Sequence, residues 1–205
     1  MKPKPVLLTI FDGFGVNPSR AHNAWALART PHLDHYFSSY PHTVLQASGR
    51  AVGLPDGQFG NSEVGHLTLG SGRVLEQDLI RIANAIYDGS FEQLPEWQSL
   101  LAGSKRLHLI GLVSDGGVHS HIEHLYGILS LLRNTEIEPV IHMITDGRDT
   151  APNVALTYLD GVEAALASLG RGSIATVSGR YSAMDRAKHW DRTEQAWKAM
   201  VLGQG

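Results

Sequence analysis

The sequence predicts an α/β fold built around a parallel sheet. Four short apolar runs have the length and composition of strands that are buried on both faces. Each run is followed by a loop rich in Gly, Asp, His or Arg, and three of these loops lead into a helical repeat of apolar residues. Strands that alternate with helices are typical of a parallel sheet. The predicted strands are Val6–Phe11, Leu107–Val113, Val140–Ile144 and Ile174–Val177.

A helix is predicted after each of the last three strands. Ser120 and Glu123 form a capping-box pattern at the start of the first helix. Pro152 can open the second helix, and Gly170 ends it. The third helix is predicted over Thr193–Leu202. The apolar stripes of the first two are Ile122, Leu125, Tyr126, Leu129 and Leu132, and Ala155, Leu159, Val162, Leu166 and Leu169.

Residues 14–60 are less regular. A short helix is expected around Trp25, and a second one starts at Thr30-Pro31. A Gly-rich stretch from Gly53 to Gly72 reads mostly as loop, apart from a helix near Ser62. An amphipathic helix is predicted over residues 75–87. Since the Gly-rich stretch ends just before it, a domain boundary is expected near residue 76.

Composition narrows the classes of function. With 205 residues, of which 42% are hydrophobic, the chain can bury a sizeable core. A net charge of −3 indicates neither a nucleic-acid partner nor a membrane surface. The absence of cysteine excludes disulfides, thiolate metal sites and a Cys nucleophile, and fits a reducing cytoplasm. The apolar run near the N-terminus is too short for a signal peptide or a membrane span.

Charged residues gather directly after the predicted strands. Ligands of open α/β sheets bind outside the carboxyl ends of the strands. The sorting of Arg, Asp and His onto this one edge therefore predicts an anion-binding site. The residues in question are Asp12 after the first strand, Asp115 and His119 after the second, Asp146, Arg148 and Asp149 after the third, and Arg180 and Arg186 after the fourth.

Ser62 lies in the segment Gly-Asn-Ser-Glu-Val-Gly-His, residues 60–66, where a turn opens a helix. A nucleophilic serine needs activation by a base or a metal. The Gly-x-Ser-x-Gly elbow of hydrolases and the Walker-type phosphate loop are both absent. Metal activation is therefore the preferred interpretation. The alternative is that Ser62 only caps a helix.

Residues 60–66, together with Asp12 in Phe-Asp-Gly-Phe-Gly, resemble the phosphoserine site of the cofactor-independent phosphoglycerate mutases, which belong to the alkaline phosphatase superfamily. The resemblance implies that Ser62 carries the phosphoryl group and that Asp12 and Ser62 are ligands of the same ion. It also implies two manganese-type ions (Mn²⁺) in the complete enzyme, with most of their ligands beyond this chain.

Three further segments carry the resemblance: residues 114–121, 146–150 and 178–186. In the family, His119 would contact the substrate. Arg148 would bind it, and Asp149 would bind it and exchange protons with the glycerate hydroxyls. Arg180 and Arg186 would clamp the phosphate and carboxylate of the substrate with planar guanidinium forks.

Plain structural interpretations stay open beside these roles. Arg148 and Asp149 could form a salt bridge with each other. Arg180 and Arg186 could join a network with Asp185 and Asp191. His119, with the nearby His121 and His124, could form a zinc-like cluster, although no third ligand stands out by spacing.

The resemblance covers nearly the whole chain and implies a partial phosphatase-like domain over residues 1–76 with a partial inserted α/β transferase domain over 77–205. The implied reaction is the interconversion of 3-phosphoglycerate and 2-phosphoglycerate in glycolysis, by a cytoplasmic monomer. The chain is expected to be an N-terminal portion that is inactive, or nearly so, alone. The alternatives are another phosphatase or a phosphopentomutase of the superfamily, or a non-catalytic anion-binding fragment.

Overall fold

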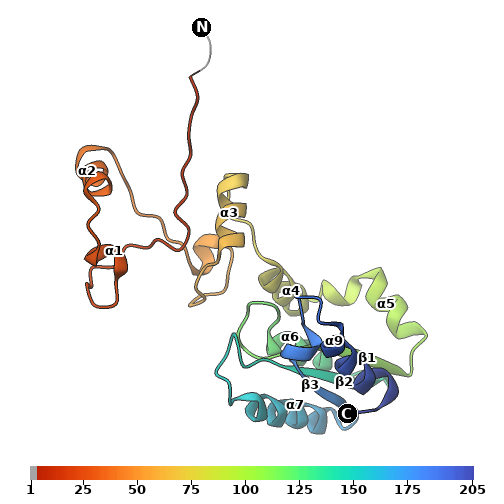
Figure 1. Cartoon of the computed structure of the whole chain (residues 1–205). Coiled ribbons are helices and arrows are strands. Elements are labelled where there is room, and N and C mark those ends of the chain that lie inside the picture. The colour runs from red at the N-terminus through yellow and green to blue at the C-terminus, as the bar shows by residue number, and fades with distance from the viewer. Residues whose placement is uncertain (1–3) are drawn as a thin grey trace. The chain divides into compact units, whose positions relative to one another are not determined.

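The computed structural model describes residues 4–205 and divides the chain into two compact units, Met1–Leu75 and Glu76–Gly205 (Figure 1). The division falls where the Gly-rich stretch ends. No helix among the described residues is long and apolar enough to cross a membrane.

The first unit is built from short helices and loops. Its elements are α1 Ala24–Leu27, α2 Pro31–Ser39, the 3-10 helix η1 Gly49–Val52 and α3 Ser62–Ser71. The helices expected around Trp25, after Thr30 and near Ser62 are therefore confirmed. A small apolar cluster joins η1 to α3 through Val52, Leu54 and Val64.

The predicted strand Val6–Phe11 is wrong in this structure. These residues form no strand, and Val6 and Leu7 are 96% and 88% exposed. A strand needs the backbone groups of a neighbouring strand to complete its hydrogen bonds. Residues 4–75 contain no other strand, only an isolated bridge between Ser48 and Phe59. The apolar composition of the run is thus not enough to form a strand.

The second unit is an α/β fold with a three-stranded parallel sheet in the order β1-β2-β3. The strands are β1 Arg106–Val113, β2 Glu138–Thr145 and β3 Ser173–Gly179, and they match the last three predicted runs. The central strand β2 is buried at every position between its two ends, as its apolar sequence predicts.

The register aligns the carboxyl ends of the three strands. Val113 of β1 pairs with Thr145 of β2, which pairs with Gly179 of β3. The residues that follow the strands therefore start from one edge of the sheet. This alignment positions the site described below.

Helices connect and cover the sheet. They are α4 Asp78–Tyr87, the 3-10 helix η2 Phe91–Gln93, α5 Pro95–Ala102, α6 Ile122–Leu131, α7 Ala155–Leu169, α8 Arg180–Ala183, α9 Trp190–Trp197 and the π-helix η3 Lys198–Leu202. The main core lies between the sheet and the helices α6 and α7, as their predicted apolar stripes require (Figure 1). Its buried residues are Val113, Ile122, Leu129, Ile141, Met143, Val162 and Leu166.

The helix predicted over Thr193–Leu202 begins earlier, at Trp190, and is a π-helix from Lys198 on. The starts of the helices after β1 and β2 also differ from the sequence predictions. His121, and not Ser120, caps α6, because its ring nitrogen Nδ1 accepts a hydrogen bond from the Glu123 backbone N–H. The Ser120 hydroxyl donates instead to the Leu112 carbonyl of β1. The second helix begins at Ala155, three residues after Pro152, which lies in a turn. It ends before Gly170, as predicted.

A polar row crosses the sheet beside the apolar core. The buried His142 has its Nε2 atom 2.9 Å from Nδ1 of His108 and its own Nδ1 2.9 Å from the Thr176 hydroxyl. Burial, followed by the neighbouring His108, lowers the pKa of His142. The imidazole of His142 is therefore held in its neutral form within the sheet.

Candidate functional site

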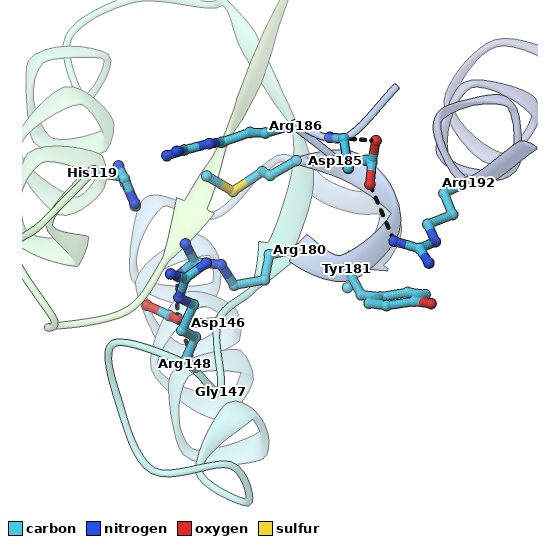
Figure 2. A pocket seen from close by; sticks show the side chains of 12 residues that line it. His119, Asp146, Gly147, Arg148, Arg180, Tyr181, Asp185, Arg186 and Arg192 are labelled. Carbon is cyan, nitrogen blue, oxygen red and sulfur yellow. Dashed lines mark hydrogen bonds and ion pairs between the residues drawn. The ribbon is translucent and has the colours of Figure 1, made fainter. Parts of the chain in front are cut away.

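A cleft of about 910 Å³ opens at the carboxyl end of the sheet in the second unit (Figure 2). It is lined by residues at or after the ends of all three strands, together with α8, the loop after it and Arg192 of α9. The lining residues are His119, Asp146, Gly147, Arg148, Gly179, Arg180, Tyr181, Met184, Asp185, Arg186, Ala187 and Arg192. His119, Arg148, Arg180 and Arg186, which the sequence singled out, therefore share one cleft.

Asp146 is the most extensively bonded carboxylate of the cleft. Its side chain is 1% exposed. The oxygen Oδ2 accepts a 2.7 Å hydrogen bond from the Ser114 hydroxyl. The oxygen Oδ1 accepts from the backbone N–H groups of Arg148 and Asp149 at 3.1 and 3.0 Å, and from Nη1 of Arg180 at 2.7 Å.

These donors fix the charge of Asp146. Burial alone would raise the pKa of this carboxyl. The hydrogen bonds from Ser114, the Asp149 N–H, Arg180 and the Arg148 N–H outweigh that effect and lower the pKa to about 2. Asp146 is therefore ionised at neutral pH although its side chain is buried.

Arg180 joins two carboxylates. Its Nη1 atom lies 2.7 Å from Oδ1 of Asp146 and 2.7 Å from Oδ2 of Asp149, and its side chain is 11% exposed. Burial opposes the charge of the guanidinium, but the bonds to Asp149 and Asp146 prevail and raise the pKa of Arg180. The alternative salt bridge between Arg148 and Asp149 does not form, because Asp149 pairs with Arg180.

His119 faces the same group from the loop after β1. Its Nε2 atom is 3.8 Å from Oδ2 of Asp149. The imidazole is 40% exposed, whereas the Asp149 side chain is 16% exposed. His119 and Arg180 therefore both lie beside Asp149, which is next to Arg148 in sequence but is not among the lining residues of the cleft.

Arg148 and Arg186 supply the uncompensated positive charge. Both residues are exposed and line the cleft (Figure 2). Neither guanidinium has a hydrogen bond or ion pair to any of the residues 4–205. Two planar forks are therefore available to carboxylate or phosphate oxygens without breaking an internal bond.

The far side of the cleft holds a second Asp–Arg pair. Asp185 accepts a 3.1 Å bond from Nη1 of Arg192, and its other oxygen accepts from the backbone N–H groups of Ala187 and His189. The Arg192 guanidinium also stacks 4.1 Å above the Tyr181 ring. Asp185 therefore pairs with Arg192. The alternative network, in which Asp185 would pair with Arg180 or Arg186, is not found among the described residues.

Two glycines allow the loops to meet. A Cβ atom at Gly116 would lie 3.0 Å from Cβ of Asp149 and 3.4 Å from Oδ2 of Asp146. Gly147 has φ of +79°, the left-handed region that favours glycine. The loop after β1 can thus lie directly against the loop that carries Asp146 and Asp149.

Ser62 and Asp12 lie in the first unit. Ser62 is exposed and is the first residue of α3, as expected from its position after a turn. Asn61 caps this helix by accepting from the Val64 N–H at 3.0 Å. Asp12 lies in an exposed turn. The shared ion that the sequence implied for Asp12 and Ser62 stays a prediction.

His66 lies beside Ser62 but is not arranged as its base. Its Nδ1 atom is 3.2 Å from the Ser62 hydroxyl and 2.7 Å from the Ser62 carbonyl. The shorter distance assigns a proton to Nδ1, because a carbonyl oxygen only accepts. A ring with its proton on Nδ1 cannot take the hydroxyl proton through that nitrogen, and metal activation of Ser62 stays a prediction.

Carboxylate and hydroxyl oxygens, such as those that Asp12 and Ser62 carry, suit a hard divalent cation. Among residues 4–205, however, no group of three or more His, Cys, Asp or Glu side chains is arranged to hold a metal. His121 caps α6, and His124 bonds the Leu79 carbonyl at 3.0 Å, so these rings do not converge with His119. The described residues alone therefore do not complete a metal site.

The sequence does not predict a role for Ser114, nor does it predict that Asp146 is the carboxylate to which Ser114, Arg180 and two backbone N–H groups all bond. Ser114 is fully buried, and its hydroxyl also accepts a bond from the Gly116 N–H. The only signal available was its position directly after a strand. Tyr181 and Arg192 were also not predicted, because only the fold brings them to the cleft.

Comparisons with known proteins place these observations in a family. Residues 82–205 match the family model described as "BPG-independent PGAM N-terminus". The chain is 53% identical to a 2,3-bisphosphoglycerate-independent phosphoglycerate mutase of Symbiobacterium thermophilum, over 98% of this chain and 40% of the relative. It is 51% identical to the corresponding enzyme of Clostridium novyi, over all of this chain and 41% of the relative.

A solved structure is similar as well. It is the crystal structure of Leishmania mexicana phosphoglycerate mutase at low cobalt concentration, with a TM-score of 0.79 and 37% sequence identity. The similarity covers 95% of this chain and 38% of that one. The chain thus spans about 40% of the length of the curated relatives that it matches.

Proposed function

The chain belongs to the BPG-independent phosphoglycerate mutase family, and on that premise we propose that the protein interconverts 3-phosphoglycerate and 2-phosphoglycerate as a step of glycolysis and gluconeogenesis. One observation carries the proposal. A single cleft combines two unpaired guanidinium groups, Arg148 and Arg186, with a third, Arg180, held against Asp149. Phosphoglycerate carries a phosphate and a carboxylate, and planar forks suit both.

The residues of the cleft divide the work on the substrate. Arg148 and Arg186 bind the anionic ends of the substrate. Arg180 adds the N–H groups that it does not donate to Asp146 and Asp149. We assign Asp149, which pairs with Arg180 at 2.7 Å, the exchange of protons with the glycerate hydroxyls. His119, 3.8 Å away, contacts the same region of the substrate. Holding both ends of the glycerate selects the oxygen that reacts.

Ser62 is the proposed carrier of the phosphoryl group between the two glycerate oxygens, through a phosphoserine. We assign Asp12 and Ser62 as oxygen ligands of a divalent cation, and manganese is our choice because it favours such ligands. A bound cation of this kind would lower the pKa of the serine hydroxyl and neutralise phosphate charge.

We assign the first unit to a phosphatase-like domain and the second to the substrate-binding transferase domain, with the family model over residues 82–205 as support. A cytoplasmic monomer is proposed. The lack of cysteine is compatible with a reducing compartment. Size-exclusion chromatography with light scattering tests the monomer.

The test of function has two parts. Calorimetry measures binding of 3-phosphoglycerate, ribose 5-phosphate and inorganic phosphate to the chain. An enolase-coupled assay with manganese and no bisphosphoglycerate measures turnover, both for the chain and for a fusion to the part of the Symbiobacterium thermophilum relative that the chain does not match. Preferential binding of 3-phosphoglycerate, with turnover in the fusion, is expected.

Two serine variants give the matched control. Ser62→Ala in the fusion should abolish turnover, whereas Ser99→Ala, an exposed serine of α5, should leave it unchanged. Turnover that survives Ser62→Ala would contradict the phosphoserine role. Preference for the sugar phosphate would instead favour a phosphopentomutase.

A further inference from the structure

Asp146 has no proposed contact with substrate. Its side chain nevertheless bonds to the residues that directly follow the other two strands of the sheet. Ser114 directly follows β1, Asp146 follows β2, and Arg180 follows β3. One carboxylate thus connects the carboxyl ends of all three strands through bonds of 2.7 Å to Ser114 and 2.7 Å to Arg180. Its side chain is 1% exposed, so water does not replace these donors.

The bond to Arg180 determines how that guanidinium is presented. Nη1 carries two N–H groups, and the two carboxylates of Asp146 and Asp149 accept from this one nitrogen. The remaining N–H groups, on Nε and Nη2, are left for a ligand. If Asp146 did not hold Nη1, Arg180 could turn about its side-chain bonds and pair with Asp149 in other geometries.

Asp146 acts on Asp149 in a second way. Its Oδ1 accepts the backbone N–H groups of both Arg148 and Asp149, so it shapes the turn from which their side chains extend. The same oxygen therefore sets the backbone of Asp149 and, through Arg180, the position of the Asp149 carboxylate.

We propose that Asp146, supported by the Ser114 hydroxyl, is a positioning residue of the phosphoglycerate site that holds Arg180 and Asp149 in one fixed arrangement toward the cleft. The inference rests on the proposed function, because it takes phosphoglycerate as the ligand that this arrangement receives. A contrasting role is purely structural, in which Asp146 only closes a turn.

Asp146→Asn separates the two roles. The amide oxygen still accepts the two backbone N–H groups, and the Ser114 hydroxyl can rotate to accept from the amide nitrogen. The turn is kept, but the charge that holds Arg180 is lost. Asp185→Asn is the matched control, because Asp185 also accepts two backbone N–H groups and one arginine, Arg192, without contact to Arg180.

The first readout is the guanidinium signal of Arg180 in ¹⁵N NMR of the chain, assigned with Arg180→Lys. The wild type should show hindered rotation with separate Nη signals. Asp146→Asn should speed this rotation about tenfold, the loss of one charged hydrogen bond. Asp185→Asn should leave Arg180 unchanged. An unaltered Arg180 signal in a folded Asp146→Asn variant would overturn the positioning role.

The second readout is the ratio of the affinities for 3-phosphoglycerate and inorganic phosphate. In Asp146→Asn we expect this ratio to fall about tenfold, because phosphate needs no fixed orientation. An unchanged ratio together with lower thermal stability would assign Asp146 to the turn alone. If the wild type itself does not prefer 3-phosphoglycerate, the proposed function fails, and the NMR result still decides whether Asp146 positions Arg180.

Discussion

Arg180 and Asp149 are 31 residues apart in the sequence, and an ion pair of 2.7 Å joins their side chains at the carboxyl end of the sheet. The same guanidinium nitrogen contacts Asp146. Internal carboxylates thus hold two arginines of the cleft, Arg180 and Arg192, whereas Arg148 and Arg186 have no such partner. Substitution of a paired arginine should therefore lower the stability of the second unit, whereas substitution of an unpaired one should weaken ligand binding.

Arg180→Met should destabilise the second unit. Removal of the guanidinium leaves Asp146 and Asp149 as adjacent buried carboxylates, at a cost of about 3 kcal/mol in the free energy of unfolding. Arg186→Met, the exposed counterpart, should change it by less than about 0.5 kcal/mol. Urea denaturation measures both. Equal effects of the two substitutions would contradict the assigned ion pairs.

Arg148→Met should weaken 3-phosphoglycerate binding without loss of stability. An unpaired guanidinium that meets a phosphate or carboxylate contributes one charged hydrogen-bonding group, so the Kd should rise at least about tenfold. Arg133→Met, an exposed arginine outside the cleft, is the control. Calorimetry gives both Kd values, and a similar rise in the control would point to a diffuse charge effect.

Acid should unfold the second unit partly through Asp146. Because the folded state lowers the pKa of this carboxyl from 3.8 to about 2, its contribution is present above pH 3.8 and is lost as the pH falls toward 2. The contribution is about 2 kcal/mol. Urea titrations between pH 5 and 2 should show a shallower loss in Asp146→Asn than in the wild type. Asp160→Asn on α7 should follow the wild type.

Mild acid should act through His142. The folded state lowers its pKa below the usual 6.5, so the unfolded chain takes up the proton first and stability falls as the pH drops below 6.5. His124 of α6, whose pKa is lowered by burial, acts in the same direction. His142→Gln should reduce the slope of Tm against pH between 7 and 5, and His32→Gln, on the exposed face of α2, should not. An unchanged slope in His142→Gln would exclude this ring as a source of the acid sensitivity.

Gly116→Ala should impair the cleft. The added methyl group would lie 3.0 Å from Cβ of Asp149 and force the two loops apart, at a cost of about 1 to 3 kcal/mol. Gly103→Ala, where a Cβ atom meets nothing within 4 Å, is the control. Thermal unfolding and 3-phosphoglycerate binding measure the effect. A Gly116→Ala variant with both properties intact would show that the loops are not tightly opposed.

The regular elements of the second unit could be predicted because their signals are local. Continuous apolar runs gave β1, β2 and β3, and helical repeats gave α6 and α7. The run Val6–Phe11 has the same local signal, but a strand depends on partners that composition does not reveal. The sequence predicts Ser120 as the cap of α6, but in the folded chain its hydroxyl donates to the Leu112 carbonyl instead.

The sequence was enough to predict which residues gather at the site, but not which of them bond to each other. Placement after strands was enough to assemble His119, Arg148, Arg180 and Arg186 at one cleft. The pairing of Arg180 with Asp146 and Asp149 depends on strand order and register, which a single sequence does not encode in short motifs. The alternative partner of Asp149 that the sequence leaves open, the adjacent Arg148, is therefore not the one found in the structure.

The bonds that meet at Asp146 have a consequence for the order of folding. They span 32 residues to Ser114 and 34 to Arg180, so each closes a long loop. A partly folded chain that had paired only β1 with β2 would contain the turn but not the guanidinium that completes it. The arrangement of Arg180 against Asp146 and Asp149 therefore depends on the pairing of β3 with β2, and a ligand that needs this arrangement would report that pairing during refolding.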